Sequence, residues 1–152
     1  MPEEKVGSLT RYTAASDGRL IGLLVPFGFN EFIDYHPNDG RRSYVTDPNL
    51  PLQIVTATGS PEDLGSKHIH QALPLQDDWP TRHKVVVCLY GSVQVELSES
   101  DGTPIGIAVM QPGDAVMLTE GHRISYLAAA SRLLEIKQGP YPGSVDKDRL
   151  FL

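Results

Sequence analysis

Short apolar runs, each followed by residues that favour turns, recur along most of the chain. In the run 92–97, valine and leucine alternate with serine, glutamine and glutamate, which is typical of a strand with one buried face. No stretch of a dozen residues shows a helical period free of glycine and proline. The pattern predicts strands near Leu20–Pro26, Glu31–Tyr35, Leu52–Ala57, Lys67–Leu73, Lys84–Tyr90, Ser92–Leu97, Ile105–Met110, Ala115–Thr119, Ile124–Leu127 and Leu133–Lys137.

Glycine, proline and aspartate mark the turns between these runs. The stretch Ser100–Thr103 predicts a hairpin. The stretch Gln111–Asp114 predicts a tight corner, in which the Asp114 carboxylate accepts hydrogen bonds from nearby backbone N–H groups. The run Val85–Tyr90 is apolar on both faces, so we expect it to lie centrally in a sheet or at a subunit contact. Short strands at this spacing predict an all-β sandwich or barrel with little or no helix.

The length of 152 residues suits one domain with a hydrophobic core. We expect a loose arm at 1–18 and a single β domain at 19–138. A C-terminal tail at 139–152 is expected to pack on the barrel or on a partner subunit. The two-faced strand and the tail together predict a homodimer, because twofold pairing is the commonest symmetry of protein assemblies.

Charge and cysteine content limit the partners and the compartment. The net charge is −6 and the longest basic run is Arg41–Arg42, so nucleic acid and anionic membranes are poor partners. The longest near-apolar run, Leu20–Phe29, is too short for a membrane helix, and the acidic N-terminus does not resemble a secretory signal. Cys88 is the only cysteine, so no intrachain disulfide can form. We therefore expect a cytoplasmic protein in which Cys88 is a small buried side chain.

The histidines are the strongest candidates for chemistry. His68 and His70 are two residues apart, so on a strand they share one face. Two imidazoles on an inner face are costly to desolvate without a partner, which a metal ion or an anionic substrate would supply. Solvent-facing or singly hydrogen-bonded histidines are the alternative. His122 follows directly on Gly121, at a bend where a third imidazole can turn inward.

The order of these pieces resembles the cupin superfamily. The first cupin motif runs from a glycine through H-x-H to a strand closed by glycine, and the second runs from Pro-Gly-Asp to a glycine near a third histidine. The matching residues here are Gly65, His68, His70 and Gly91, followed by Pro112, Gly113, Asp114, Gly121 and His122. The resemblance implies a jelly-roll barrel of two antiparallel sheets. It also implies a site in which His68, His70 and His122 hold one divalent transition metal, such as Zn, Fe, Ni, Cu or Mn.

Two features depart from that pattern. The insert Gln71–Arg82 is longer than usual and could be a lid over the barrel mouth or a plain surface loop. Lys84 stands where cupins carry an acidic ligand, and a protonated lysine cannot coordinate a cation. Strand alternation allows Lys84 or His83 to face the cavity, but not both. Lys84 would anchor the substrate or act as an acid–base group, whereas His83 would replace the missing ligand.

Further resemblances leave other functions open. The segment His83–Leu97 resembles a strand pair of the sugar-nucleotide 3,4-ketoisomerases, which are metal-free jelly rolls. That likeness implies His70 or His68 as the general base, with His83 as its neighbour. The Lys-Gln-Gly-Pro-Tyr stretch at 137–141 is similar to the tail of a group of small uncharacterised cupins. Candidates for substrate binding near the histidine motifs are Arg82, Arg123 and Tyr126, because arginine pairs readily with carboxylate or phosphate.

Three functions follow from these residues. The first is a metal-binding cupin that acts on a small polar or anionic metabolite as an isomerase, lyase or oxygenase. The second is a metal-free sugar-nucleotide isomerase or epimerase with histidine as the general base. The third is a non-catalytic cupin that only binds a ligand. Lys84 at the acidic position favours the second and third over the first.

Overall fold

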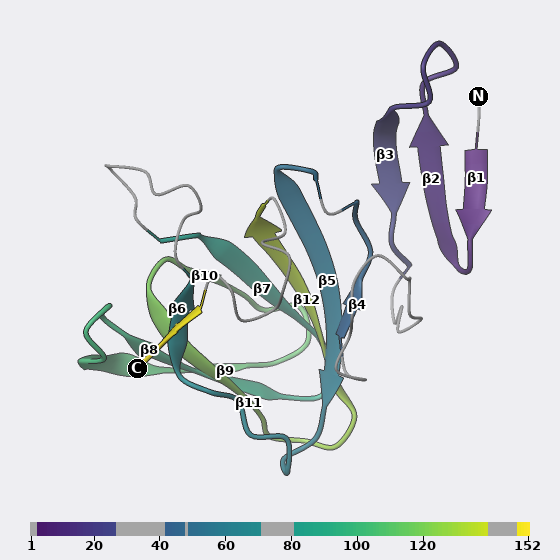
Figure 1. Cartoon of the computed structure of the whole chain (residues 1–152). Coiled ribbons are helices and arrows are strands. Elements are labelled where there is room, and N and C mark those ends of the chain that lie inside the picture. Colours follow the sequence, from purple (N-terminus) through teal and green to yellow (C-terminus); the bar gives the residue numbers. More distant parts are fainter. Residues whose placement is uncertain (1–2, 27–41, 48, 71–80, 140–148) are drawn as a thin grey trace. The chain divides into compact units, whose positions relative to one another are not determined.

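The computed structural model describes residues 3–26, 42–47, 49–70, 81–139 and 149–152. These residues contain thirteen strands and no helix (Figure 1). Within them, no helical segment is long and apolar enough to cross a membrane. The contacts divide the chain into two units, Met1–Glu31 and Phe32–Leu152, which we describe separately.

The first unit is a three-stranded antiparallel sheet of β1 (Glu3–Val6), β2 (Leu9–Thr13) and β3 (Leu20–Leu24). Gly7, with a φ of 60°, makes the turn between the first two strands. Of these strands, the sequence predicted β3 alone, because β1 and β2 are polar and lack an apolar run. The arm expected at 1–18 thus contains two strands, and β3 lies with them rather than with the second unit.

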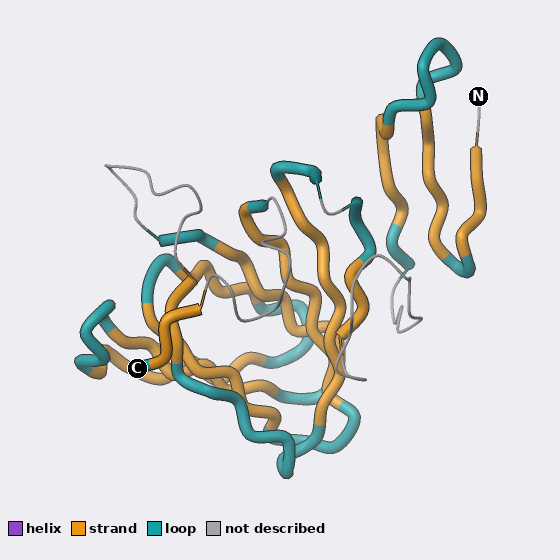
Figure 2. Tube along the Cα trace, viewed as in Figure 1, coloured by secondary structure: helices purple, strands orange, loops and turns teal. Residues whose placement is uncertain are grey.

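The second unit contains two five-stranded antiparallel sheets (Figure 2). Sheet I has the order β10-β7-β12-β5-β4, and sheet II has the order β13-β6-β11-β8-β9. The strands of sheet I are β4 (Arg42–Tyr44), β5 (Leu52–Gly59), β7 (Lys84–Tyr90), β10 (Ala115–Leu118) and β12 (Ser131–Gln138). The strands of sheet II are β6 (His68–His70), β8 (Val93–Ser98), β9 (Pro104–Met110), β11 (Gly121–Tyr126) and β13 (Arg149–Phe151). Two antiparallel sheets without a described helix confirm the predicted jelly-roll class.

The core lies between the inner faces of the two sheets. Val93 and Val95 of β8 are fully buried, as their alternation predicted. On β7, Val86 and Cys88 are also fully buried, whereas Val85, Val87 and Leu89, which alternate with them, are half-buried. The strand lies inside sheet I, between β10 and β12, so its predicted central position is confirmed. The buried Cys88 is confirmed as well, and burial raises the pKa of its thiol.

The predicted turns form as their residues require. In the β8–β9 hairpin, the Glu99 N–H donates to the Thr103 carbonyl at 2.9 Å. At the corner before β10, the Gln111 N–H donates to the Asp114 carboxylate at 2.8 Å. Gly113 has a φ of 95° there, and its N–H bonds the Cys88 carbonyl at 2.8 Å, which ties the corner to β7.

The C-terminal tail contributes a strand that the sequence did not predict. Strand β13 pairs with β6 in the register Arg149↔His70 and Phe151↔His68. The Leu152 N–H extends this pairing to the Lys67 carbonyl at 3.0 Å. The end of the tail is therefore part of sheet II, beside the strand that carries two histidines. The strand expected at 31–35, the insert at 71–80 and the residues 140–148 lie outside the described part of the chain.

Candidate metal centre

Three histidine side chains meet inside the second unit. His68 and His70 project from β6, and His122 from the neighbouring β11, where it is the register partner of His68. All three are buried, with 6%, 4% and 2% of their surface exposed. One ring nitrogen from each lies within 4.8 Å of the others, and the Nε2 atoms of His68 and His70 are 3.2 Å apart. The structure thus brings together the three residues expected to be metal ligands.

Neighbouring strands hold β6 in this position. Gly65 lies so close to the Ile124 carbonyl of β11 that a Cβ atom would have no room. A β-bridge between Leu64 and Ser125 holds the segment before β6 against β11 at the same place. On the other side, β13 pairs along β6, and the ring of Phe151 lies 6.2 Å from that of His68. The glycine of the first motif is therefore needed where the backbone passes β11.

Backbone carbonyls fix the orientation of two of the imidazoles. His68 Nδ1 lies 2.9 Å from the Ser66 carbonyl, and His122 Nδ1 lies 3.0 Å from the Glu120 carbonyl. Since a carbonyl only accepts, each Nδ1 carries the proton and each Nε2 keeps a lone pair. Metal-binding histidines are commonly oriented by a carbonyl that accepts a hydrogen bond from the ring nitrogen facing away from the metal. The Glu120 carboxylate instead accepts hydrogen bonds from the backbone N–H and the hydroxyl of Ser100, at 2.8 and 3.1 Å.

The electrostatics of His122 favour the neutral imidazole that a metal requires. Burial lowers the pKa of His122 well below its ordinary value, and the nearby charge of Lys84 lowers it further. Its Nε2 atom is buried and has no hydrogen-bond partner. A buried nitrogen lone pair without a donor is costly unless something binds it. This observation supports the fit of a metal ion to the three residues.

Lys84 faces the interior, whereas His83 lies outside the histidine group. Lys84 is 5% exposed, and its Nζ lies 3.4 Å from Glu135 Oε1 of β12. His83 precedes β7 and bonds Gln138 through its backbone: its N–H donates to the Gln138 side chain at 2.7 Å. The His83 ring is not part of the histidine group. Lys84 therefore faces inward, as strand alternation predicts when the register is not shifted by one residue. Its role in substrate binding or proton transfer stays a prediction.

The other candidates lie in different environments. The buried Arg82 donates from Nη1 to the Gln138 carbonyl at 3.3 Å. Arg123 is 43% exposed on the outer face of sheet II, 3.7 Å from the Glu96 carboxylate. Tyr126, at the far end of β11 from His122, covers Gly59 and packs against the core. The structure does not bring Arg123 or Tyr126 to the histidines. Strand alternation next to His122 could have predicted the outward Arg123.

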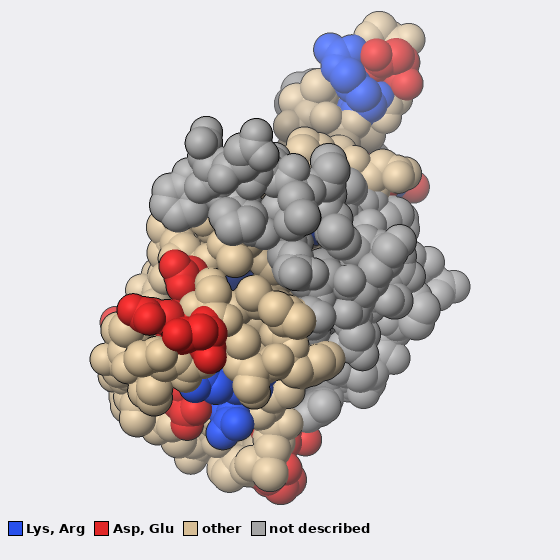
Figure 3. All heavy atoms as spheres, turned by 60° about the vertical axis from the view of Figure 1, so that its left-hand side comes forward, with Lys and Arg blue, Asp and Glu red and all other residues tan. Residues whose placement is uncertain are grey.

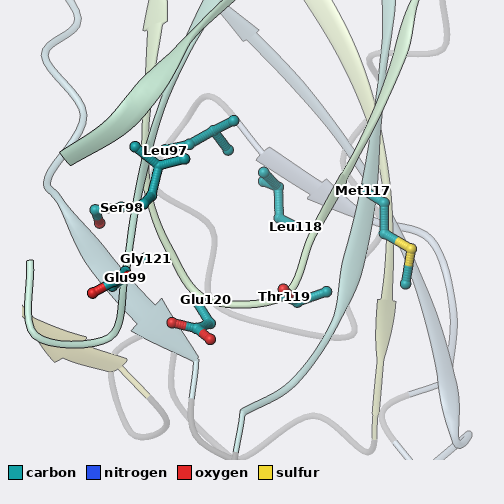
Figure 4. Close-up of a pocket in the computed structure, with 9 residues that line it drawn as sticks. Leu97, Ser98, Glu99, Met117, Leu118, Thr119, Glu120 and Gly121 are labelled. Carbon is teal, nitrogen blue, oxygen red and sulfur yellow. The ribbon is translucent and has the colours of Figure 1, made fainter. Parts of the chain in front are cut away.

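A pocket of about 350 Å³ lies between β10 and the start of β11, and no pattern in the sequence predicted it. Figure 4 shows its lining, in which Met117 and Leu118 project from β10 to different sides. Gly121 of the lining precedes His122 in the chain, and Leu118 is the register partner of Lys84. The remaining lining residues are Leu97, Ser98, Glu99, Ile105, Thr119 and Glu120.

The outer surface has a different character from the interior. On the face in Figure 3, acidic side chains gather in a group, and the lysines and arginines among the described residues form no extended patch. This distribution agrees with the net charge of −6. Lys84 and Lys137 are buried in a chain whose net charge is negative.

Comparison with known proteins shows the fold. No family model matches the chain, and no curated protein matches its sequence. Oxalate decarboxylase from Bacillus subtilis at pH 4.6 superposes with a TM-score of 0.55 and 19% identity, over 73% of this chain and 27% of that chain. The same enzyme in a study of its Mn(II) centres superposes with a TM-score of 0.54 and 19% identity, over 73% of this chain and 28% of that chain. KdgF from Halomonas sp. gives a TM-score of 0.48 and 20% identity, over 64% of this chain and 76% of that chain.

The present chain thus spans little more than a quarter of the oxalate decarboxylase chain that it resembles. At this level of identity the likeness confirms the fold alone, a jelly-roll barrel of two antiparallel sheets. It does not test the resemblance to sugar-nucleotide ketoisomerases or to the group with the Lys-Gln-Gly-Pro-Tyr tail, and these remain predictions.

Proposed function

We propose that this chain is a metal-binding cupin enzyme that acts on a small polar or anionic metabolite. His68, His70 and His122 hold one divalent transition metal in this proposal. The observation that carries it is the buried Nε2 of His122, which has no hydrogen-bond partner and lies in a group with two further imidazoles. Neutral imidazoles are ligands for Zn, Fe, Ni or Mn. When bound, such an ion supplies Lewis-acid or oxygen-activating chemistry.

The ligand set favours an anionic substrate. Within the described residues, no carboxylate joins the three histidines, so the candidate ligands among these residues are all neutral. The position of the usual acidic ligand is taken by Lys84, which is buried and whose charge lowers the pKa of His122. An anionic substrate bound to the metal would balance the positive charge of the ion, which neutral imidazoles do not offset. Isomerase, lyase and oxygenase reactions are all compatible with this arrangement, with Lys84 as the substrate-anchoring or acid–base group.

Metal titration of the chelator-treated protein tests the proposal. Mn²⁺, Fe²⁺ under anaerobic conditions, Ni²⁺ and Zn²⁺ are each titrated by calorimetry, and Mn²⁺ comes first because an enzyme of this fold has Mn(II) centres. We expect one site per chain for at least one ion, and a rise in unfolding free energy of about 2.7 kcal/mol at an ion concentration 100 times Kd.

Two histidine variants make the result specific. His122→Ala should abolish the metal response, whereas His83→Ala should retain it, because His83 lies outside the histidine group. No binding of any ion by the wild type would overturn the proposal and favour the alternative, in which a histidine acts as general base without a metal. Equal loss in both variants would show that the ion does not occupy the predicted site.

A further inference from the structure

Strand β9 is apolar on both faces although it lies at the edge of sheet II. Its sequence, Pro104–Met110, contains no charged, hydroxyl or amide side chain. Ala108 and Met110 face the core, since they are the register partners of the buried Val95 and Val93. Among the described strands, β8 alone pairs with β9. A strand with two apolar faces is usually covered on both, and the described residues cover only one face of β9.

The outward face of β9 presents three large aliphatic side chains in a row. Ile105, Ile107 and Val109, which we call the β9 row, are 63%, 64% and 54% exposed. The outward residues beside them on β8 are polar, because Gln94 is the register partner of Val109 and Glu96 is that of Ile107. The β9 row is therefore an apolar strip with a polar border, and protein interfaces have the same apolar centre and polar rim.

The backbone of β9 also offers a long edge. Edge strands present unpaired N–H and C=O groups, and proteins usually protect them with charges, prolines, bulges or short length. The other edge strands of the two sheets, β4, β10 and β13, have three or four residues, whereas β9 has seven. The protecting features of β9 are confined to its start, where Pro104 lies beside the register shift at Leu97/Ser98. The rest of the strand is an open edge within the described structure.

The pattern of the β9 row fits a second copy of the chain. Strands that are apolar on both faces lie in the middle of a sheet or at a subunit contact, and β9 does not lie in the middle. If two copies of β9 pair antiparallel about Ile107, then Ile105 lies opposite the second copy's Val109. Aliphatic side chains thus meet along the whole row, and cross-strand pairs of this kind stabilise a sheet.

Charge does not oppose this pairing along the strand. Glu96, the outward charge on β8, lies 3.7 Å from Arg123 of β11. Three strand spacings of about 4.8 Å would separate Glu96 from its counterpart, which is more than the Debye length of about 8 Å in physiological salt. The turns at the two ends of β9 contain Asp101 and Asp114, and antiparallel pairing brings one kind of turn toward the other. The remaining repulsion therefore lies at the ends of the contact, where salt screens it.

We propose that the chain forms a twofold dimer in which β9 pairs antiparallel with β9 of a second copy, centred on Ile107. Sheet II then continues from one copy into the other, and the two β9 rows form one apolar cluster. The contact is β9 rather than the strand 85–90 or the C-terminal tail, and it does not depend on a bound metal. Because a single strand pair is a small contact, we expect the dimer to dissociate on dilution.

Sedimentation velocity on a dilution series of wild type and Ile107→Lys tests the proposal. The wild type should approach twice the 16.6 kDa of one chain as its concentration rises. Ile107→Lys sets two ammonium groups opposite each other at the twofold axis and should raise the dissociation constant about tenfold or more. Ile21→Lys is the matched control, because Ile21 is a 63% exposed isoleucine on a strand of the first unit. It should dimerise like the wild type.

A cysteine variant tests the register without adding a charge. Opposite residues of an antiparallel pair have Cα atoms about 4.5–5.5 Å apart, which is within the range that a disulfide spans. Ile107→Cys should therefore form a covalent dimer under mild oxidation, whereas Ile21→Cys should not. The native Cys88 is fully buried and does not compete.

Salt dependence gives an independent readout of the same contact. Raising the salt concentration should tighten the wild-type dimer, because it screens the acidic turns and the net charge of −6 on each chain. A dimer that salt weakens would be held by ion pairs, and that result would overturn the proposal. A wild type that stays monomeric at its highest soluble concentration would overturn it too. So would a dissociation constant that Ile107→Lys leaves unchanged, or a crosslink that forms in Ile21→Cys but not in Ile107→Cys.

Discussion

Gly65→Ala should weaken metal binding without touching a histidine. A Cβ at this position would meet the Ile124 carbonyl oxygen of β11 closer than the 3.0 Å that real Cβ contacts keep. The obstacle is backbone in the middle of a paired strand, so the segment before β6 has to move instead. That segment includes Ser66, whose carbonyl holds His68 Nδ1 at 2.9 Å. Loss of a hydrogen bond that orients a metal ligand typically costs 10–100-fold in metal affinity.

The effect on stability follows from the same overlap. Forcing an extra carbon into packed structure costs about 1–3 kcal/mol, which lowers the melting temperature of a chain of this size by roughly 2–12 °C. Gly106→Ala is the matched control, because a Cβ there meets nothing within 4 Å. Melting curves and calorimetric metal titrations on both variants give the two quantities. If Gly65→Ala melts lower but binds metal like the wild type, the Ser66 carbonyl does not control His68 and our reasoning is wrong.

Three further predictions concern titration, reactivity and assembly. The pKa of His122 is lowered from 6.5, so below that pH the unfolded chain binds a proton that the folded chain does not bind. Urea unfolding of the metal-free protein should therefore show up to about 1.4 kcal/mol of stability lost per pH unit below about 6.5. His122→Asn should lack this part of the slope, and an unchanged slope would contradict it. Cys88, which is fully buried with a raised pKa, should react with a thiol reagent in denaturant and hardly at all in the native state. Light scattering should give twice the 16.6 kDa of one chain, whereas a mass near 16.6 kDa would refute the predicted homodimer.

Local patterns were sufficient to predict the histidine group and the strands of the second unit other than β4 and β13. The alternation in 92–97 predicted which valines are buried, because a strand has a period of two. His68 and His70 share a face for the same reason. The bend expected at Gly121 is instead the start of β11, and His122 turns inward from that strand as predicted. Each of these inferences needs only residues that are close in sequence.

Contacts between distant strands were beyond such reasoning. The register sets Lys137 opposite Lys84, and no local pattern fixes which residues of β7 and β12 are partners. The pairing of β13 with β6 is of the same kind. Strands β1 and β2 were not predicted for another reason. Their residues are mostly polar and show no apolar alternation, and hydrogen bonds to the neighbouring strand are what define them as strands.

The metal content of untagged protein, purified after growth in metal-supplemented medium, tests the central claim most directly. Elemental analysis should find close to one transition-metal ion per chain in the wild type, and almost none in His122→Ala, because the ion binds only the folded site. A wild-type content below about 0.1 ion per chain would contradict the metal-binding account, since a structural or catalytic site of ordinary affinity stays loaded through purification.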